Sequence, residues 1–177
     1  MKNNKNKIFI ALLTVIGLLS IVLATGCERD DICDTENTAI TPRLIITFQD
    51  FENTEIRKRA SGLEISLTSD SERIVPEITT FDSIAIPLNI NEDTVSYQFK
   101  INAQSDDESI VRENTIEFSY KRTNEYVSKA CGFRTTYDEL TFTTSAEFDE
   151  TKNWIRNILI ENNTVNEETD AHVRIFH

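Results

Sequence analysis

The feature that most constrains the fold is a two-residue hydrophobic repeat that recurs along most of the chain. Its clearest example is residues 95–103, where Val95, Tyr97, Phe99, Ile101 and Ala103 alternate with polar residues. Alternation of this kind predicts β-strands with one buried face. The same pattern predicts strands within residues 44–48, 63–67, 84–90, 116–120, 126–137 and 140–146, and the strand over 126–137 would carry Cys131.

The spacing of these segments predicts the fold class. Short strands about 10 residues apart, joined by Asn, Asp and Ser turns, are typical of an all-β antiparallel β-sandwich, and we expect an immunoglobulin-like or transthyretin-like one. An open barrel is the competing architecture. Pro87 cannot donate a backbone hydrogen bond, so its strand is expected at a sheet edge.

The C-terminal part of the chain has a less regular pattern. Residues 154–160 carry apolar side chains that suit either a strand or a short helix, and residues 173–176 suit a final strand. We favour two strands joined by the acidic loop 161–171. Trp154 is predicted to lie in the core rather than to form a sugar-binding platform.

The N-terminus has the layout of a secretory signal. Lys2, Lys5 and Lys7 precede an apolar run from Ile8 to Leu23, and small residues then lead into Cys27. The run is shorter than the roughly 20 residues that cross a bilayer, and acidic residues follow it. We therefore predict a signal peptide over residues 1–26, an acidic tether over 27–41 and one β-sandwich domain over 42–177.

Small residues that run into a cysteine resemble the lipobox of bacterial lipoproteins. That resemblance implies that Cys27 is acylated and becomes the mature N-terminus, although the large apolar residue, Leu23, stands one place earlier than usual. Several acyl chains, at about 0.8 kcal/mol per buried methylene, would make the anchor effectively permanent. A soluble secreted form is the alternative.

The cysteines predict a cross-link. If Cys27 carries lipid, Cys33 and Cys131 remain as an even pair, which in an oxidising compartment indicates a disulfide. Closing a loop of about 100 residues is worth on the order of 4–5 kcal/mol in the chain-entropy model. A metal pair or a catalytic thiol is the alternative, but no histidine lies near either cysteine in the sequence.

The charge of the mature chain limits its partners. The signal contains three lysines and no acidic residue, so 15 basic and 30 acidic side chains remain, with a formal charge of −15. Such a surface repels nucleic acid and anionic membrane faces. We therefore expect no nucleic-acid partner, and we expect the lipid bilayer to be contacted through acylated Cys27.

A search for catalytic residues finds few candidates. His172 and His177 are the only histidines, and isolated histidines on a terminal strand are more often packing or surface residues than bases or ligands. The carboxylates of residues 106–108, and the Asn89, Asn91 and Asp93 series, lack the full ligand set of a calcium loop. The sequence thus predicts no enzyme, cofactor or metal.

Three segments carry a family resemblance: residues 27–33 around the first two mature cysteines, 130–134 around Cys131, and 171–175 around His172. Together they resemble an uncharacterised family of Bacteroidetes lipoproteins. The resemblance implies a location in the cell envelope and a disulfide, and it implies no activity. The acidic residues after Cys27 also resemble the signal for surface export in that group, although a solvated charge run explains them equally well.

These observations predict an outer-membrane lipoprotein that acts as a non-catalytic binding or accessory module, possessing no cofactor and serving another envelope protein. The alternatives are a carbohydrate-binding module and a carboxylate-dependent glycan hydrolase. The hydrolase would need two carboxyl groups roughly 5–10 Å apart in a concave cleft.

Overall fold

The computed structural model describes residues 33, 40–69, 74, 79–144 and 153–177. Their elements are β1 (Leu44–Gln49), β2 (Ala60–Leu67), β3 (Thr79–Phe81), β4 (Ser83–Ile86), β5 (Thr94–Ile101), the 3-10 helix η2 (Glu108–Ile110), β6 (Arg112–Ser128), β7 (Gly132–Thr144), β8 (Asn157–Ile160) and β9 (Val173–Phe176). Within these ranges no helix is long and apolar enough to cross a membrane. The chain forms two compact units, residues 39–127 with 133–177, and residues 1–38 with 128–132.

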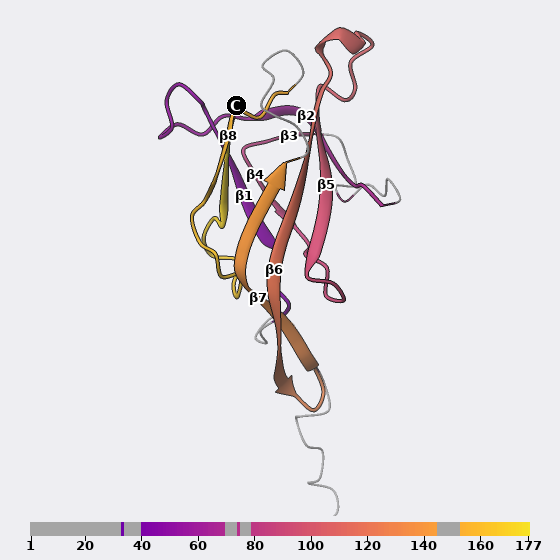
Figure 1. The fold of residues 1–177 in the computed structure, drawn as a ribbon, viewed down its shortest axis with the longest axis vertical. Coiled ribbons are helices and arrows are strands. Elements are labelled where there is room, and N and C mark those ends of the chain that lie inside the picture. Colours follow the sequence, from indigo (N-terminus) through magenta and orange to yellow (C-terminus); the bar gives the residue numbers. More distant parts are fainter. Residues whose placement is uncertain (1–32, 34–39, 70–73, 75–78, 145–152) are drawn as a thin grey trace, which may run out of the picture. The chain divides into compact units, whose positions relative to one another are not determined.

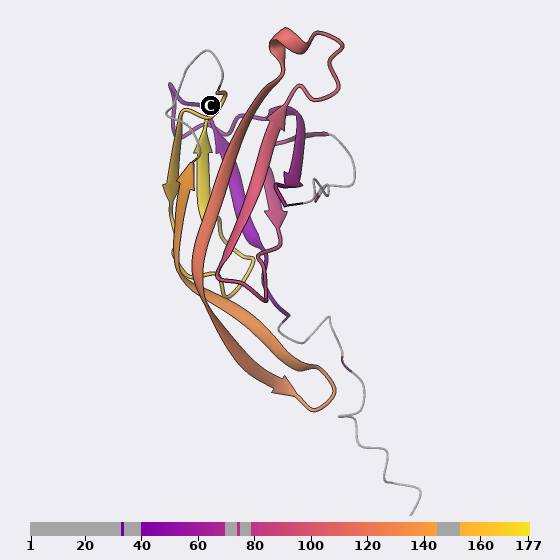
Figure 2. The same ribbon diagram turned by 45° about the vertical axis from the view of Figure 1, so that its right-hand side comes forward.

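The larger unit is an all-β sandwich, as predicted, but it is not purely antiparallel, because β1 and β9 pair in parallel. One sheet has the order β4-β1-β9-β8 and the other has the order β3-β2-β5-β6-β7; β5, β6 and β7 run side by side (Figures 1 and 2). β1 pairs antiparallel with β4 and parallel with β9. The final strand thus pairs back onto the domain, and β4, which precedes Pro87, lies at a sheet edge as predicted.

The core lies between the sheets and follows the two-residue repeat. In β1 the side chains of Leu44, Ile46 and Phe48 are fully buried, and in β5 those of Tyr97 and Phe99 are. The other strands and the segment before β8 contribute further buried residues, among them Leu63, Ile65, Ile86, Ile116, Phe118, Ile155, Val173 and Ile175. Removing this apolar surface from water is the main favourable contribution to folding.

Three buried tyrosines hold the segment that crosses between the sheets. Residues 87–89 lead from β4 in one sheet to β5 in the other, and their carbonyls accept hydrogen bonds from tyrosines of the five-stranded sheet. The donors are the hydroxyl groups of Tyr97 to Pro87 O at 2.5 Å, Tyr137 to Leu88 O at 3.3 Å and Tyr120 to Asn89 O at 3.1 Å. We call Tyr97, Tyr120 and Tyr137 the tyrosine cluster. Their hydroxyl groups satisfy the backbone carbonyls of a segment that has no strand partner.

The predicted single strand over residues 126–137 is wrong, because a turn at residues 129–131 divides it into the ends of β6 and β7. Gly132 follows the turn with φ of 71°, a conformation that favours glycine. Glu139 also has positive φ, and it lies between Tyr137 and Leu140, which are both buried although an odd number of positions apart. The irregular backbone at Glu139 therefore allows β7 to continue into the segment that the repeat had assigned to a separate strand.

Two other strands are shorter in the structure than the sequence predicted. β4 ends at Ile86 rather than continuing to Ile90, since the chain there leaves the sheet and binds the tyrosine cluster. In residues 154–160 the structure forms a strand, as favoured, but only from Asn157 onward. Trp154 precedes that strand and is 6% exposed, so it is a core residue as predicted.

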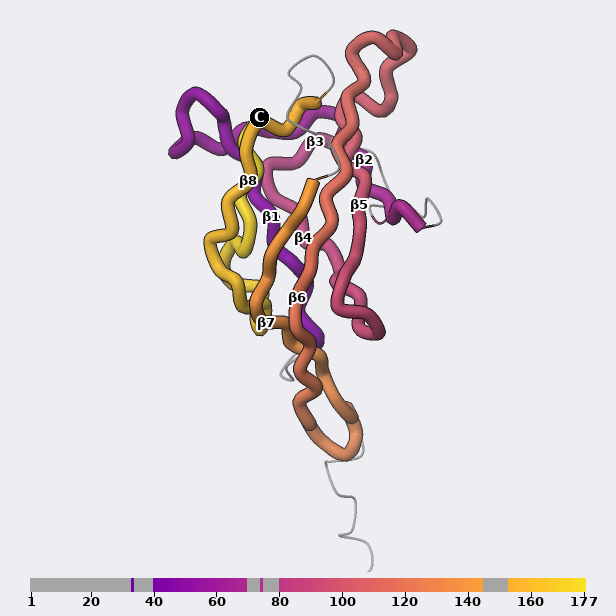
Figure 3. Tube along the Cα trace, in the orientation of Figure 1, coloured from indigo at the N-terminus to yellow at the C-terminus, as the bar shows by residue number. Residues whose placement is uncertain are grey.

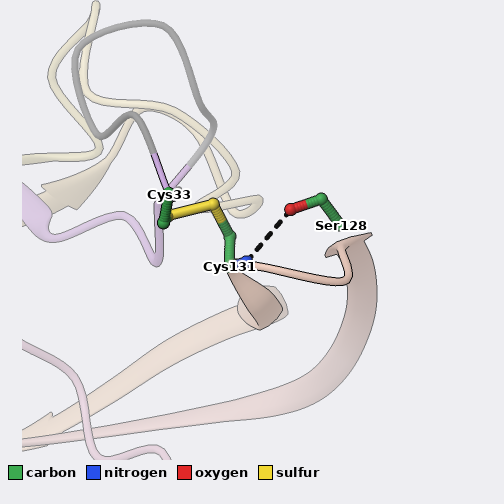
Figure 4. Close-up of a disulfide and its surroundings, with 3 residues drawn as sticks. All are labelled: Cys33, Ser128 and Cys131. Atoms are coloured by element: carbon green, nitrogen blue, oxygen red, sulfur yellow. Dashed lines mark hydrogen bonds between the residues drawn. A yellow bond between two sulfur atoms is a disulfide. The ribbon is translucent and has the colours of Figure 1, made fainter. Parts of the chain in front are cut away.

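The smaller unit contains the predicted disulfide. The sulfur atoms of Cys33 and Cys131 are bonded across a sequence separation of 98, and the backbone N–H of Cys131 donates to Ser128 Oγ at 3.0 Å (Figure 4). This confirms the cysteine pairing. Of residues 1–38 the structure describes Cys33 alone, so the predicted signal peptide and the predicted acylation site Cys27 lie outside the described residues.

The described contacts lower the stabilisation expected from this disulfide. Thr41 Oγ1 already accepts a hydrogen bond from Thr135 N–H at 3.0 Å, so in the folded chain the bond closes only a ring of about 12 residues. In the unfolded chain it closes a loop of 98 residues. Each doubling of loop length costs about 0.6 kcal/mol, and three doublings separate the two loops, so the net gain is about 2 kcal/mol.

We therefore predict that replacing both cysteines by serine lowers the free energy of unfolding by about 2 kcal/mol. Urea unfolding of the double variant and of the oxidised wild type measures the difference. A loss of 4–5 kcal/mol, the full chain-entropy value, would contradict the argument that Thr41 and Thr135 already restrict the folded loop.

Candidate functional site

A polar hollow lies on the outer face of the four-stranded sheet, and we call it the outer-face pocket. Its volume is about 610 Å³. It is lined by Thr47 and Gln49 of β1, Arg174 of β9, Thr54, Glu55 and Arg57 of the segment after β1, and Glu161, Asn162, Asp170 and Ala171 of the loop between β8 and β9. This volume lies within the range of small-molecule sites.

The floor of the pocket follows from the strand repeat. Because Leu44, Ile46 and Phe48 point into the core, Thr47 and Gln49 point to the opposite face of β1. Thr47 is the register partner of Arg174 in β9, which brings these two side chains to the same part of the sheet. Both Thr47 and Gln49 are nevertheless buried, at 2% and 7% exposure, because the flanking segments cover them.

One wall of the pocket is the segment 50–59, which loops out from the end of β1 at the upper left of Figure 3 and returns to it. Asp50 Oδ1 accepts hydrogen bonds from the backbone N–H groups of Glu52 and Asn53, each at 2.9 Å. The bond from Asn53, followed by that from Lys58, lowers the pKa of Asp50. The backbone of Arg57 forms an isolated antiparallel β-bridge with that of Gln49, which fixes the wall against β1.

The opposite wall is the predicted acidic loop between β8 and β9. Glu161 accepts from Arg174 at 3.1 Å at the pocket itself. Farther along the loop, Glu168 accepts from the backbone and side-chain nitrogens of Arg43 at 2.6–2.9 Å. The side-chain bond from Arg43 is the main cause of the lowered pKa of Glu168. These charge-assisted bonds hold the loop at both ends.

Gln49 is the most informative residue of the pocket. Its Nε2 donates to Thr47 Oγ1 at 3.5 Å, a long hydrogen bond. Its Oε1 is buried and has no hydrogen-bond partner among the described residues. A buried amide oxygen without a partner costs about 1–3 kcal/mol, and most buried polar groups are satisfied. The amide is therefore held weakly, in a side chain that lines the pocket.

The two histidines are packing residues, as the sequence predicted. His172 is 2% exposed, and its Nδ1 accepts from the backbone N–H of Ile45 at 3.0 Å, which ties the loop to β1. Burial lowers its pKa. The ring of His177 contacts those of Trp154 and Phe48, at centroid distances of 5.2 and 6.3 Å, and burial lowers its pKa as well.

Three of the side chains that the sequence analysis considered as calcium ligands, Asp107, Asp93 and Asn89, accept hydrogen bonds within the protein. Asp107 caps η2 by accepting from the side chain and backbone of Ser109, which lowers its pKa. Asp93 accepts from Arg122 at 2.6 Å, and Asn89 Oδ1 accepts from Asn91 N–H at 2.9 Å. Within the described ranges, no three His, Cys, Asp or Glu side chains are grouped so as to hold a metal ion.

Sequence reasoning missed the outer-face pocket. The signal that could have found it is the pair Thr47 and Gln49 in a strand whose other residues are apolar, but solvent-facing positions of many strands look the same. Its walls are formed by segments that lie far apart in sequence, and nothing in the local pattern brings Arg57 and Asp170 together.

Comparison with known proteins adds one assignment. Neither the curated proteins nor the solved structures include a significant match to this chain. A family model matches residues 62–177, which covers most of the sandwich and includes Cys131, the loop between β8 and β9, and β9. The chain therefore belongs to a family of unknown function (DUF6452).

Proposed function

We propose that this protein is a lipid-anchored, non-catalytic binding module of the outer membrane, and that the outer-face pocket binds a neutral, hydroxyl-rich ligand of saccharide type. The observation that carries the binding role is the unpartnered amide oxygen of Gln49 beside a polar pocket of about 610 Å³. The anchor is supported by the signal-like N-terminus and by its lipobox-like end at Cys27.

The lining favours hydroxyl groups as the ligand chemistry. Amides, hydroxyls, guanidinium groups and carboxylates all line the pocket, so both donors and acceptors are available to a hydroxyl, which needs both. Two arginines face three carboxylates, and Arg174 is already paired with Glu161. This near balance favours a neutral ligand over a strongly charged one.

Access to Gln49 requires a small rearrangement. The amide oxygen is covered in the unliganded structure, but rotation of the side chain would break only the 3.5 Å bond from Nε2 to Thr47. A ligand hydroxyl that donates to Oε1 would supply the missing hydrogen bond. The free energy of that bond would thus add to ligand binding with little opposing loss.

Carboxylate-dependent glycan hydrolysis is the second candidate, because Glu55, Glu161 and Asp170 line the same pocket. Binding is the better proposal because Glu161 Oε2 already accepts from Arg174 at 3.1 Å, so this carboxylate is engaged in an ion pair within the protein.

Two experiments test the proposal. Metabolic labelling with palmitate is expected to label the wild type but not Cys27→Ala, and unlabelled wild type would refute the anchor. The mature protein purified from membranes would then be screened against neutral mono- and oligosaccharides by saturation-transfer NMR. We expect binding of at least one class without cleavage; release of reducing sugar would instead establish the hydrolase.

A further inference from the structure

An exposed aromatic pair marks the end of the β6–β7 hairpin. Tyr126 and Phe133 are 63% and 69% exposed, and their rings meet edge to face with centroids 5.4 Å apart. Single exposed apolar side chains are ordinary on protein surfaces, whereas contiguous apolar patches are a feature of interaction sites. Two aromatic rings on facing strands form such a patch.

The patch is presented by an ordered part of the sheet. β5 pairs with β6 only from Arg112 to Ser119, and the later part of β6 continues alongside β7 (Figure 2). Behind the rings, Arg134 is paired with Glu125 at 2.7 Å and Thr135 Oγ1 donates to Asn124 Oδ1 at 2.9 Å. Tyr126 and Phe133 therefore project from a braced hairpin.

Covalent connection limits how far this hairpin end can be from the proposed lipid. Phe133 follows Cys131 by two residues, and Cys131 is bonded to Cys33 with a Cα–Cα distance of 4.9 Å. Cys33 lies six residues after Cys27, and six extended residues span at most about 20–22 Å. Adding the 4.9 Å across the disulfide, an acylated Cys27 keeps Cys131 within about 27 Å of the bilayer surface.

Local charge also suits a bilayer. Residues 126–134 contain Lys129 and Arg134 and no acidic residue, although the mature chain has a formal charge of −15. Because Arg134 is paired with Glu125, Lys129 is the cation that this segment offers to lipid. Lys129 is exposed. Aromatic rings with neighbouring basic side chains are the composition found at membrane interfaces, where the rings lie at headgroup level and the cations attract anionic lipid.

We propose that the end of the β6–β7 hairpin, through Tyr126 and Phe133, inserts into the headgroup region of the phospholipid bilayer that carries the lipid anchor. This inference rests on the proposed acylation of Cys27. The anchor holds the hairpin end near the bilayer, and the aromatic pair adds a second contact that restricts the orientation of the domain.

Fluorescence quenching tests the proposal in the full acylated protein, reconstituted into phosphatidylethanolamine–phosphatidylglycerol vesicles with or without brominated acyl chains. Phe133→Trp places a reporter on the patch. Phe51→Trp is the matched control, since Phe51 is also an exposed phenylalanine, at 51%, and lies between β1 and β2. The native Trp154 is buried and provides the background signal.

We expect brominated lipid to quench the Phe133→Trp variant at least twofold more than the wild type or the Phe51→Trp variant. Equal quenching of the two variants, or none above the wild type, would overturn the inference while leaving the anchor intact. Mass spectrometry of the same samples separates the two claims, because an unacylated Cys27 would overturn the anchor and this inference with it.

Discussion

Replacing Trp154 by alanine is expected to lower the free energy of unfolding by about 3–5 kcal/mol, the usual cost of truncating a buried tryptophan. The side chain is 6% exposed and its ring contacts that of Phe48 in the four-stranded sheet, at a centroid distance of 6.0 Å. Its Nε1–H donates to Phe99 O in the five-stranded sheet at 3.1 Å. Trp154 thus joins the two layers, and its removal leaves a cavity between them.

The backbone around Trp154 is fixed separately, by Asn114 of β6. Asn114 Oδ1 accepts from the N–H groups of Trp154 and Ile155 at 3.1 and 3.2 Å. Trp154→Phe is the matched control, since it keeps an aromatic ring but removes the indole N–H. We expect this variant to lower the free energy of unfolding by about 1–2 kcal/mol. Urea unfolding followed by circular dichroism measures both variants. A loss below 1 kcal/mol for Trp154→Ala would show that the layers do not depend on this residue.

Alkaline unfolding is the second large effect that we expect, because the tyrosine cluster must stay protonated to donate its hydrogen bonds. Burial raises the pKa of Tyr97 and of Tyr137, and raises that of Tyr120 to about 12. An unfolded tyrosine has a pKa of about 10. Stability from these groups is therefore fully present below pH 10 and is lost as pH rises through the higher pKa values of the folded state.

The shift of Tyr120 alone corresponds to roughly 3 kcal/mol at most. We predict a cooperative loss of the β-sheet circular dichroism signal between about pH 10 and pH 12, with phenolate absorbance of the three cluster tyrosines appearing together with it. Tyr126, which is exposed, provides the reference tyrosine. If the cluster tyrosines ionised at pH 10 while the sheet signal persisted, their hydroxyl groups could not be holding residues 87–89.

The sequence predicted the sandwich because period-two burial is a local property. Leu44, Ile46 and Phe48 reveal one buried face whatever strand they pair with, and so do Val95, Tyr97 and Phe99. The parallel pairing of β1 with β9 could not be read in this way, because it depends on contacts between residues more than 120 positions apart.

Local backbone geometry explains the strand that was predicted wrongly. Apolar residues continue through the turn between β6 and β7, so the repeat conceals it, and the only sequence signal is Gly132. Glu139 adopts positive φ without being glycine, which no composition rule indicates. The candidate site escaped prediction for a related reason: Gln49 differs from an ordinary surface glutamine only through the segments that cover it.

The most direct test of the central claim compares Gln49→Met with wild type in both stability and ligand affinity. Methionine has a similar shape and removes the unpartnered amide oxygen, so we expect the free energy of unfolding to rise by about 1 kcal/mol. We expect the affinity for the saccharide found in the screen to fall at least tenfold. Gln98→Met, in β5 and outside the pocket lining, is the matched control and should change neither affinity nor stability appreciably. Affinity equal to that of the wild type in Gln49→Met, or no saccharide bound by the wild type, would contradict the assignment of the outer-face pocket as the ligand site.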